Sequence, residues 1–241
     1  MAKGKLVAYV KDVTDKKSKN FIPIEDRIAV FDMDGTLLDS MYIWRHIALR
    51  YIEKNNIPLP EDMKGEMAIM GIGSVADFLI EKFHINMTRE EMLAELWIIM
   101  EDYYRTEAVL KPGAADMLKK LRERNIPTLL FSATPEHILH PVLTRLDIKK
   151  YFSHGLLSCA TIKQTKHEPE AFMTAARHLG VPYQDVMIFE DAWYAASTAK
   201  KAGFTLGIVA DREEHKTEEM RALADFYIEK SWDEFPIDRY F

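Results

Sequence analysis

The sequence has a single cysteine, Cys159, and no apolar run of the length that a membrane helix needs. One thiol excludes an intramolecular disulfide, and it also excludes a zinc or iron–sulfur site built from several thiolates. A membrane helix requires about 18 or more consecutive apolar residues, and the first twenty residues contain no signal-peptide core. We therefore expect a protein of the reducing cytoplasm that has no membrane partner.

The whole chain also has fewer positively charged residues than negatively charged ones. The 241 residues include 32 Lys and Arg against 38 Asp and Glu, which gives a formal net charge of −6. This balance disfavours a nucleic-acid partner, whereas a small anionic ligand needs only a local positive site. Hydrophobic residues make up 48% and charged residues 29%, as in ordinary globular proteins. We expect one large domain or a domain with a sizeable insertion, in a monomer or a weak dimer.

Residues 1–26 differ in composition from the rest of the chain. Six lysines and two aspartates among the first twenty residues give a local charge of +4. Two strand-like segments, Leu6–Val10 and Phe21–Ile24, flank a polar turn and predict a β-hairpin in this N-terminal extension. An arm that binds nucleic acid or anionic lipid is the alternative, although a solvated lysine-rich turn is commoner.

Beyond residue 26, short apolar segments alternate with helical ones. Continuous apolar strands suit a parallel sheet that is covered on both faces, so the fold class predicted is α/β with a Rossmann-like, doubly wound core. The predicted strands are Ile28–Phe31, Thr128–Phe131, Gly155–Leu157, Val186–Phe189 and Leu206–Val209. The predicted helices between them are Ala114–Arg124, Pro135–Leu146, Pro169–Leu179 and Ala192–Ala202.

Residues 41–109 interrupt this alternation, because they contain helical patterns only. An insertion of this size predicts an all-helical cap between the two parts of the core, residues 27–40 and 110–241. The start of the last cap helix carries a capping-box pattern at residues 88–91. The predicted cap helices are Met41–Lys54, Glu61–Ile69, Val75–Phe83 and Arg89–Thr106.

Carboxylates follow two of the predicted strands. Asp32 and Asp34 follow the first strand, where Gly35 permits a sharp turn, and Glu190 and Asp191 follow the fourth. The carboxyl ends of parallel strands form the edge at which ligands bind in open α/β sheets. Four oxygen donors without thiolates or a histidine cluster favour a hard cation, so the sequence predicts a Mg²⁺ site.

Hydroxyl groups and a lysine complete the predicted site. Ser132 and Thr134 follow the second strand, and Lys166 precedes a helix that begins at Pro169. A nucleophilic carboxylate, a hydroxyl group, a lysine and a metal are the parts needed for phosphoryl transfer through an aspartyl phosphate.

In these motifs the chain resembles the haloacid dehalogenase-like superfamily, in the branch with a helical cap inserted after the first strand. Residues 32–36, Asp-Met-Asp-Gly-Thr, match its D-x-D-G-T motif, and Lys166, Pro169 and Phe172 follow its K-x-x-P-x-x-F spacing. Ser132 and residues 190–191 occupy the positions of the second and fourth motifs. The resemblance extends from about residue 27 to residue 228.

The resemblance implies a role for each matched residue. Asp32 is then the nucleophile, and Asp34 is the acid/base that protonates the leaving alcohol and later activates water. Ser132 and Lys166 are also catalytic, and together with Ala133 they bind the phosphoryl group. The implied ligands of Mg²⁺ are Asp32, Asp34, Glu190 and Asp191.

The sequence departs from the family at the fourth motif, commonly E-D-S-x-x-G. Ala192 removes a hydroxyl group there, and Ala195 replaces a glycine. His167 stands where proline is frequent, and of all the histidines it is the one expected nearest the site. Other polar residues near the motifs have structural interpretations: Asp39 and Ser40 as turn and helix-cap residues, and Thr36 as structural.

Three functions fit these residues. The first is a magnesium-dependent phosphatase acting on a small phosphomonoester such as a sugar phosphate. The second is a β-phosphoglucomutase-like mutase, although Thr36 favours the phosphatase because such mutases often have valine there. The third is a catalytically weak binding scaffold, which Ala192 and the basic extension favour and the intact motifs oppose. Asp34 argues against dehalogenation and phosphonate hydrolysis, and no motif identifies the substrate.

Overall fold

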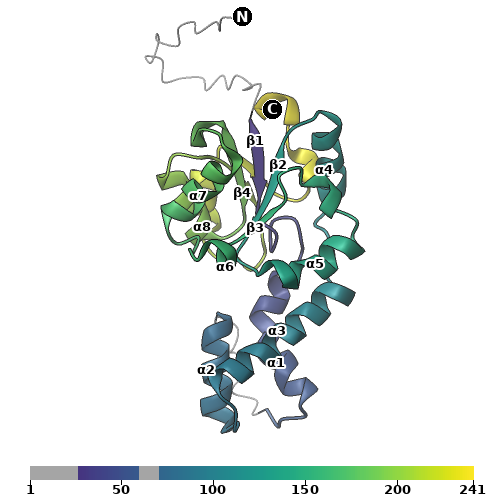
Figure 1. Cartoon of the computed structure of the whole chain (residues 1–241), viewed down its shortest axis with the longest axis vertical. Helices are drawn as coiled ribbons and strands as arrows, with labels where there is room; N and C mark the ends of the chain where they lie inside the picture. The colour runs from purple at the N-terminus through teal and green to yellow at the C-terminus, as the bar shows by residue number, and fades with distance from the viewer. Residues whose placement is uncertain (1–26, 60–70) are drawn as a thin grey trace, which may run out of the picture.

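A six-stranded parallel sheet forms the centre of the computed structural model, which describes residues 27–59 and 71–241 (Figure 1). The strand order is β3-β2-β1-β4-β5-β6, and every neighbouring pair is parallel. The chain builds one half outward from β1 and the other outward from β4, so the switch point lies between these two central strands. The strands are β1 (Ile28–Phe31), β2 (Thr128–Ser132), β3 (Leu156–Ser158), β4 (Val186–Glu190), β5 (Thr205–Val209) and β6 (Phe226–Ile228).

This architecture confirms the predicted fold class and adds elements that the hydrophobic pattern did not reveal. Strand β6 was not predicted, and β2 and β4 each extend one residue further, onto the polar side chains of Ser132 and Glu190. The core helices are α4 (Ala114–Glu123), α5 (Glu136–Arg145), α6 (Cys159–Ile162), α7 (Pro169–Leu179), α8 (Trp193–Lys201), α9 (Thr217–Leu223) and α10 (Ile237–Tyr240). Short 3₁₀ turns occupy Lys149–Tyr151, Tyr183–Asp185 and Trp232–Glu234.

Alternate residues of β1 belong to different hydrophobic clusters. Ile28 and Val30 pack with the side chains of α7 and α8, whereas Ala29 and Phe31 pack with those of α4 and α5. Successive side chains of a strand point to opposite faces, so a strand covered on both faces needs apolar residues at every position. This explains the uninterrupted apolar sequence of the central strands.

The cap helices lie together beyond one end of the sheet (Figure 1). The predicted capping box is confirmed, since Thr88 and Glu91 exchange backbone and side-chain hydrogen bonds at the start of α3. The helix predicted at Val75–Phe83 begins three residues earlier, at Ile72. The described cap helices are α1 (Met41–Lys54), α2 (Ile72–Phe83) and α3 (Arg89–Thr106).

The N-terminal hairpin and the helix predicted at Glu61–Ile69 lie outside the described residues. No described helix combines the length and the apolar composition that a membrane span requires.

The chain crosses between core and cap through two segments that are bonded to each other. The Asp39 N–H donates to the Val109 carbonyl at 3.0 Å, and the Lys111 N–H donates to the Leu37 carbonyl at 2.8 Å. We use the term joint for these two crossings, residues 37–40 and 107–111. The joint places the start of α1 directly after the carboxylates that follow β1.

Helix α8 begins shortly after Glu190, the last residue of β4, and Asp191. Ala192 occupies its N-cap position and has no hydroxyl group to cap the helix. Instead, Glu214 accepts a hydrogen bond from the Trp193 N–H at 2.9 Å. Ala195 lies inside α8, fully buried, where an alanine is well accommodated. The two departures from the fourth motif are therefore compatible with a regular helix start beside Asp191.

We predict that Glu214→Ala destabilises the fold by removing this cap. The free energy of unfolding should fall by about 1 kcal/mol, as is typical of a lost N-cap interaction. Equilibrium urea unfolding measures the change. Ala192→Ser in the same background should restore part of the loss, because its hydroxyl group accepts from the same end of α8.

Glu81→Ala, which removes an exposed carboxylate from α2, serves as the matched control and should leave the unfolding free energy unchanged. If Glu214→Ala and Glu81→Ala have the same unfolding free energy, Glu214 does not cap α8.

Candidate active site

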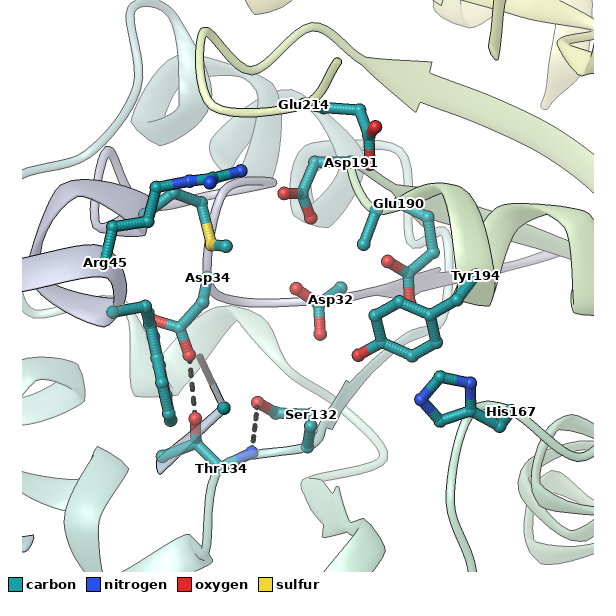
Figure 2. A pocket seen from close by; sticks show the side chains of 15 residues that line it. Asp32, Asp34, Arg45, Ser132, Thr134, His167, Glu190, Asp191, Tyr194 and Glu214 are labelled. Carbon is teal, nitrogen blue, oxygen red and sulfur yellow. Dashed lines mark hydrogen bonds between the residues drawn. The ribbon is translucent and has the colours of Figure 1, made fainter. Parts of the chain in front are cut away.

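A cavity of 560 Å³ opens where β1, β2 and β4 end, and helix α1 of the cap contributes to its wall (Figure 2). Lys166 does not itself line the cavity, but it binds Asp32 and Glu190, which do. The structure therefore brings all the predicted site residues together, while their individual roles stay predictions. The predicted residues in the cavity wall are Asp32, Asp34, Ser132, Ala133, Glu190 and Asp191.

Lys166 joins the first and fourth motifs. Its Nζ donates to Asp32 Oδ1 at 2.5 Å and to Glu190 Oε1 at 2.6 Å. All three side chains are buried, so their charges depend on one another. Burial lowers the pKa of Lys166, but the attraction of Asp32 and Glu190 outweighs it and the pKa is raised. Lys166 therefore keeps its positive charge next to Asp32.

Asp32, Glu190 and Asp191 each offer a carboxylate oxygen, and these oxygens lie within 4.8 Å of one another. Burial raises the pKa of Asp32 to about 8, with repulsion from Glu190 adding to the shift and Lys166 opposing it. Burial and repulsion from Asp32 also raise the pKa of Asp191 well above its usual value. An all-oxygen, electron-rich group of this kind fits a hard divalent cation such as Mg²⁺. The Asp34 carboxylate is not in this group, and its part as a metal ligand stays a prediction.

The turn after β1 brings Asp191 close to the backbone. Gly35 has φ +78°, and a Cβ atom there would lie 1.9 Å from Asp191 Oδ2. Glycine is needed at this position both for the left-handed conformation and for the space. The next residue, Thr36, donates from Oγ1 to Asp191 Oδ1 at 3.1 Å. The interpretation of Thr36 as structural is thus refined, because it orients a carboxylate of the site.

Three hydroxyl groups donate to the Asp34 carboxylate. Ser40 Oγ and the Tyr104 hydroxyl donate to Oδ1 at 2.7 and 2.6 Å, and Thr134 Oγ1 donates to Oδ2 at 2.8 Å (Figure 2 shows the Thr134 bond). Ser40 occupies the N-cap position of α1, as predicted, but its hydroxyl group bonds Asp34 and none of the helix N–H groups. Asp39 pairs on the surface with Arg212 at 3.6 Å, as expected of a residue outside the chemistry.

Ser132 and Ala133 line the cavity on the side of β2. Ser132 Oγ accepts from the Thr134 N–H at 3.1 Å, which leaves its own proton available to a bound oxyanion (Figure 2). His167 also lines the cavity, as expected, and its ring stacks on Tyr194 with the centroids 4.2 Å apart. These residues line the cavity from the core.

The cavity also contains residues that the sequence motifs did not identify. Arg45 on α1 forms an ion pair with Glu213 at 2.9 Å, which links the cap to the loop after β5. Tyr194 and Glu214 line the cavity from the core. Tyr194 follows Asp191 by three residues, so the pattern of strand, carboxylate and helix places it in the first helical turn facing the site. The cap residues and Glu214 have no comparable signal.

Three comparisons with known proteins agree with this geometry. Residues 27–203 match the family described as haloacid dehalogenase-like hydrolase. The (DL)-glycerol-3-phosphatase 2 of Arabidopsis thaliana is 31% identical over 195 residues, covering 76% of this chain and 78% of that protein. The beta-phosphoglucomutase of Bacillus subtilis is 29% identical over 197 residues, covering 76% and 83%.

Solved structures agree on the fold. The crystal structure of a haloacid dehalogenase hydrolase, family IA, variant 3, from Entamoeba histolytica matches with a TM-score of 0.69 and 17% identity, covering 88% of this chain and 97% of that one. At this identity the likeness shows the fold alone. Because the family match covers most of the chain and the first relative is 31% identical over three quarters of it, this protein belongs to the haloacid dehalogenase-like hydrolase family and is an enzyme.

Proposed function

We propose that the enzyme is a magnesium-dependent phosphatase that hydrolyses small phosphomonoesters, such as sugar phosphates, through an aspartyl phosphate at Asp32. The observation that carries the proposal is the pairing of Asp32 with Lys166 beside two further carboxylates at the open end of the sheet. Relatives named as phosphatases support the reaction class. The single cysteine, free in the structure, is consistent with a reducing cytoplasm.

The residues that would hold Mg²⁺ are Asp32, Glu190 and Asp191, and the ion would supply positive charge against the phosphoryl oxygens. Lys166 orients Asp32 and adds a second positive charge. Ser132 donates its hydroxyl proton to a phosphoryl oxygen, which binds and aligns the group.

In the first half-reaction, a carboxylate oxygen of Asp32 attacks phosphorus in line. The new bond forms as the ester P–O bond breaks, and Asp34 gives its proton to the departing alkoxide. In the second half-reaction, the same Asp34 takes a proton from water, whose oxygen attacks phosphorus as the P–O bond to Asp32 breaks. This step regenerates the Asp32 carboxylate and releases inorganic phosphate. The cavity and the cap limit bulk water around the first step.

A mutase that transfers the phosphoryl group to a sugar phosphate is the second candidate, because one relative is named a beta-phosphoglucomutase. Such a transfer makes a sugar bisphosphate, whose second phosphate needs a cation away from Asp32. Among the described residues that line the cavity, Arg45 is the only arginine or lysine, and its guanidinium is paired with Glu213. Glu214 adds a further carboxylate to the lining. Because the cavity wall offers little positive charge for a second phosphate, it favours substrates with an uncharged leaving group. This preference supports the phosphatase over the mutase.

The binding-scaffold alternative loses one of its two supports. Glu214 replaces the missing hydroxyl group of Ala192 at the start of α8, so this substitution is no sign of a decayed site. The other support, the basic extension, lies outside the described residues.

We predict that chelation abolishes phosphate release and that Mg²⁺ restores it. The raised pKa of Asp32, about 8, means that the folded metal-free protein holds this proton more tightly than the unfolded chain does. The stability from this group is complete below about pH 4 and is lost as the pH rises through about 8. Magnesium binds the ionised carboxylates, so the rise in Tm that it causes should increase between about pH 6 and pH 8.

Colorimetric phosphate release and thermal unfolding, each with and without chelator, measure these effects. Asp39→Asn, a change in a carboxylate outside the site, should behave as the native enzyme does. Full activity in excess chelator, with the metal content verified as nil, would show that the reaction does not require Mg²⁺.

We predict that hexose phosphates yield inorganic phosphate, because water is the acceptor. Quantifying phosphate and sugar phosphates in the same reaction separates the two candidates. Conversion to an isomeric sugar phosphate with little free phosphate would overturn the phosphatase in favour of the mutase.

Glu213→Gln tests the reason given for this preference. It removes the carboxylate that pairs with Arg45, so substrates with a second anionic group should improve several-fold in KM relative to substrates with an uncharged leaving group. An unchanged ratio would show that the Arg45 pair does not determine this selectivity.

A further inference from the structure

The three hydroxyl groups that hold Asp34 come from three different parts of the molecule. Ser40 belongs to the joint, Thr134 follows β2 in the core, and Tyr104 lies on α3 of the cap. All three side chains are almost completely buried, with at most 1% of their surface exposed. The position of Asp34 is therefore set jointly by the core, the joint and the cap.

Tyr104 is held at the end of α3 that approaches the core. Helix α3 packs against α5, and the Arg145 guanidinium on α5 donates to the Tyr104 carbonyl at 3.1 Å and also to the Ala108 carbonyl. The backbone of Tyr104 is thereby fixed to the core while its side chain passes from the cap to Asp34.

Hydrogen bonds on both oxygens restrict the rotation of the Asp34 side chain. Thr134 holds Oδ2 from the core side, whereas Tyr104 and Ser40 share Oδ1. Loss of the Tyr104 bond leaves Oδ1 with one weaker, non-aromatic donor and widens the range of orientations of the carboxyl group. Proton transfer depends steeply on orientation, whereas phosphoryl binding to Ser132 and Lys166 does not involve this bond.

We propose that Tyr104 is a positioning residue through which the cap aims Asp34 at the leaving-group oxygen. The inference rests on the proposed function, since it assigns Tyr104 a part only in the acid/base work of Asp34. It adds a contribution of the cap to the chemistry that is separate from its contacts with substrate.

The test compares Tyr104→Phe on two substrates with different demands for a proton. An alkyl phosphate leaves as a poorly stabilised alkoxide, whereas p-nitrophenyl phosphate leaves as a stabilised phenolate. For Tyr104→Phe we expect kcat/KM to fall about 10-fold for the alkyl phosphate and by less than about 2-fold for the aryl phosphate, a fraction of the total general-acid effect. Inhibition by inorganic phosphate should be unchanged.

Tyr103→Phe is the matched control, because it removes the neighbouring hydroxyl group of the same helix, which donates to the Asp39 carbonyl at 3.3 Å. It should change both substrates by less than about 2-fold, a margin well below the effect of general acid catalysis. In an Asp34→Asn background, Tyr104→Phe should cause no further loss, because a residue that acts through Asp34 is not additive with it. Thermal unfolding of each variant confirms that it is folded.

Two results overturn the assignment of Tyr104. Equal losses on both substrates would mean that the tyrosine supports the fold or the binding of phosphate. A full additional loss in the Asp34→Asn background would mean that it acts independently of Asp34. If Asp34→Asn itself fails to distinguish the two substrates, the acid role in the proposed function is wrong, and the inference falls with it.

Discussion

Buried carboxylates gather at the ends of β1 and β4, and the other features of the site follow from their mutual repulsion. Asp32, Glu190 and Asp191 place carboxylate oxygens within 4.8 Å of one another, and one lysine supplies the positive charge between two of them. The pKa values of Asp32 and Asp191 are raised by this burial. Positive charge near Asp32 and Asp191 favours their ionised forms, which makes the site suited to a divalent cation and its phosphate ligand.

The fold supplies this arrangement through the two central strands. The order β3-β2-β1-β4-β5-β6 places β1 beside β4, so motifs more than 150 residues apart meet at one edge of the sheet. Gly35 leaves room for Asp191, and Glu214 caps the helix that follows it. The same turn leads into the joint, from which the cap reaches back to Asp34 through Tyr104. The cap therefore bounds the cavity and also contacts the Asp34 carboxylate.

The sequence predicted the parts of the site that depend on strand ends. Asp32, Ser132 and Glu190 follow apolar strands, and parallel pairing alone brings such residues together. Tyr104 and Glu214 were not predicted, because each reaches the site through tertiary packing across long separations in sequence. Ser40 was assigned to the wrong partner, since a serine before a helix caps it in most proteins but here donates to Asp34. Strand β6 was missed because it is an apolar run of only three residues that is partly buried.

In the proposed mechanism Asp32 becomes phosphorylated, and acid quenching during turnover of a radiolabelled phosphomonoester detects this intermediate. Mass spectrometry of the quenched peptides should locate a hydroxylamine-labile acyl phosphate on Asp32 in the native enzyme and in Asp39→Asn. Asp32→Asn, which keeps the shape of the side chain, should carry no label and release no phosphate. Rapid phosphate release without label on Asp32 at any quench time, or near-normal turnover by Asp32→Asn, would contradict the account.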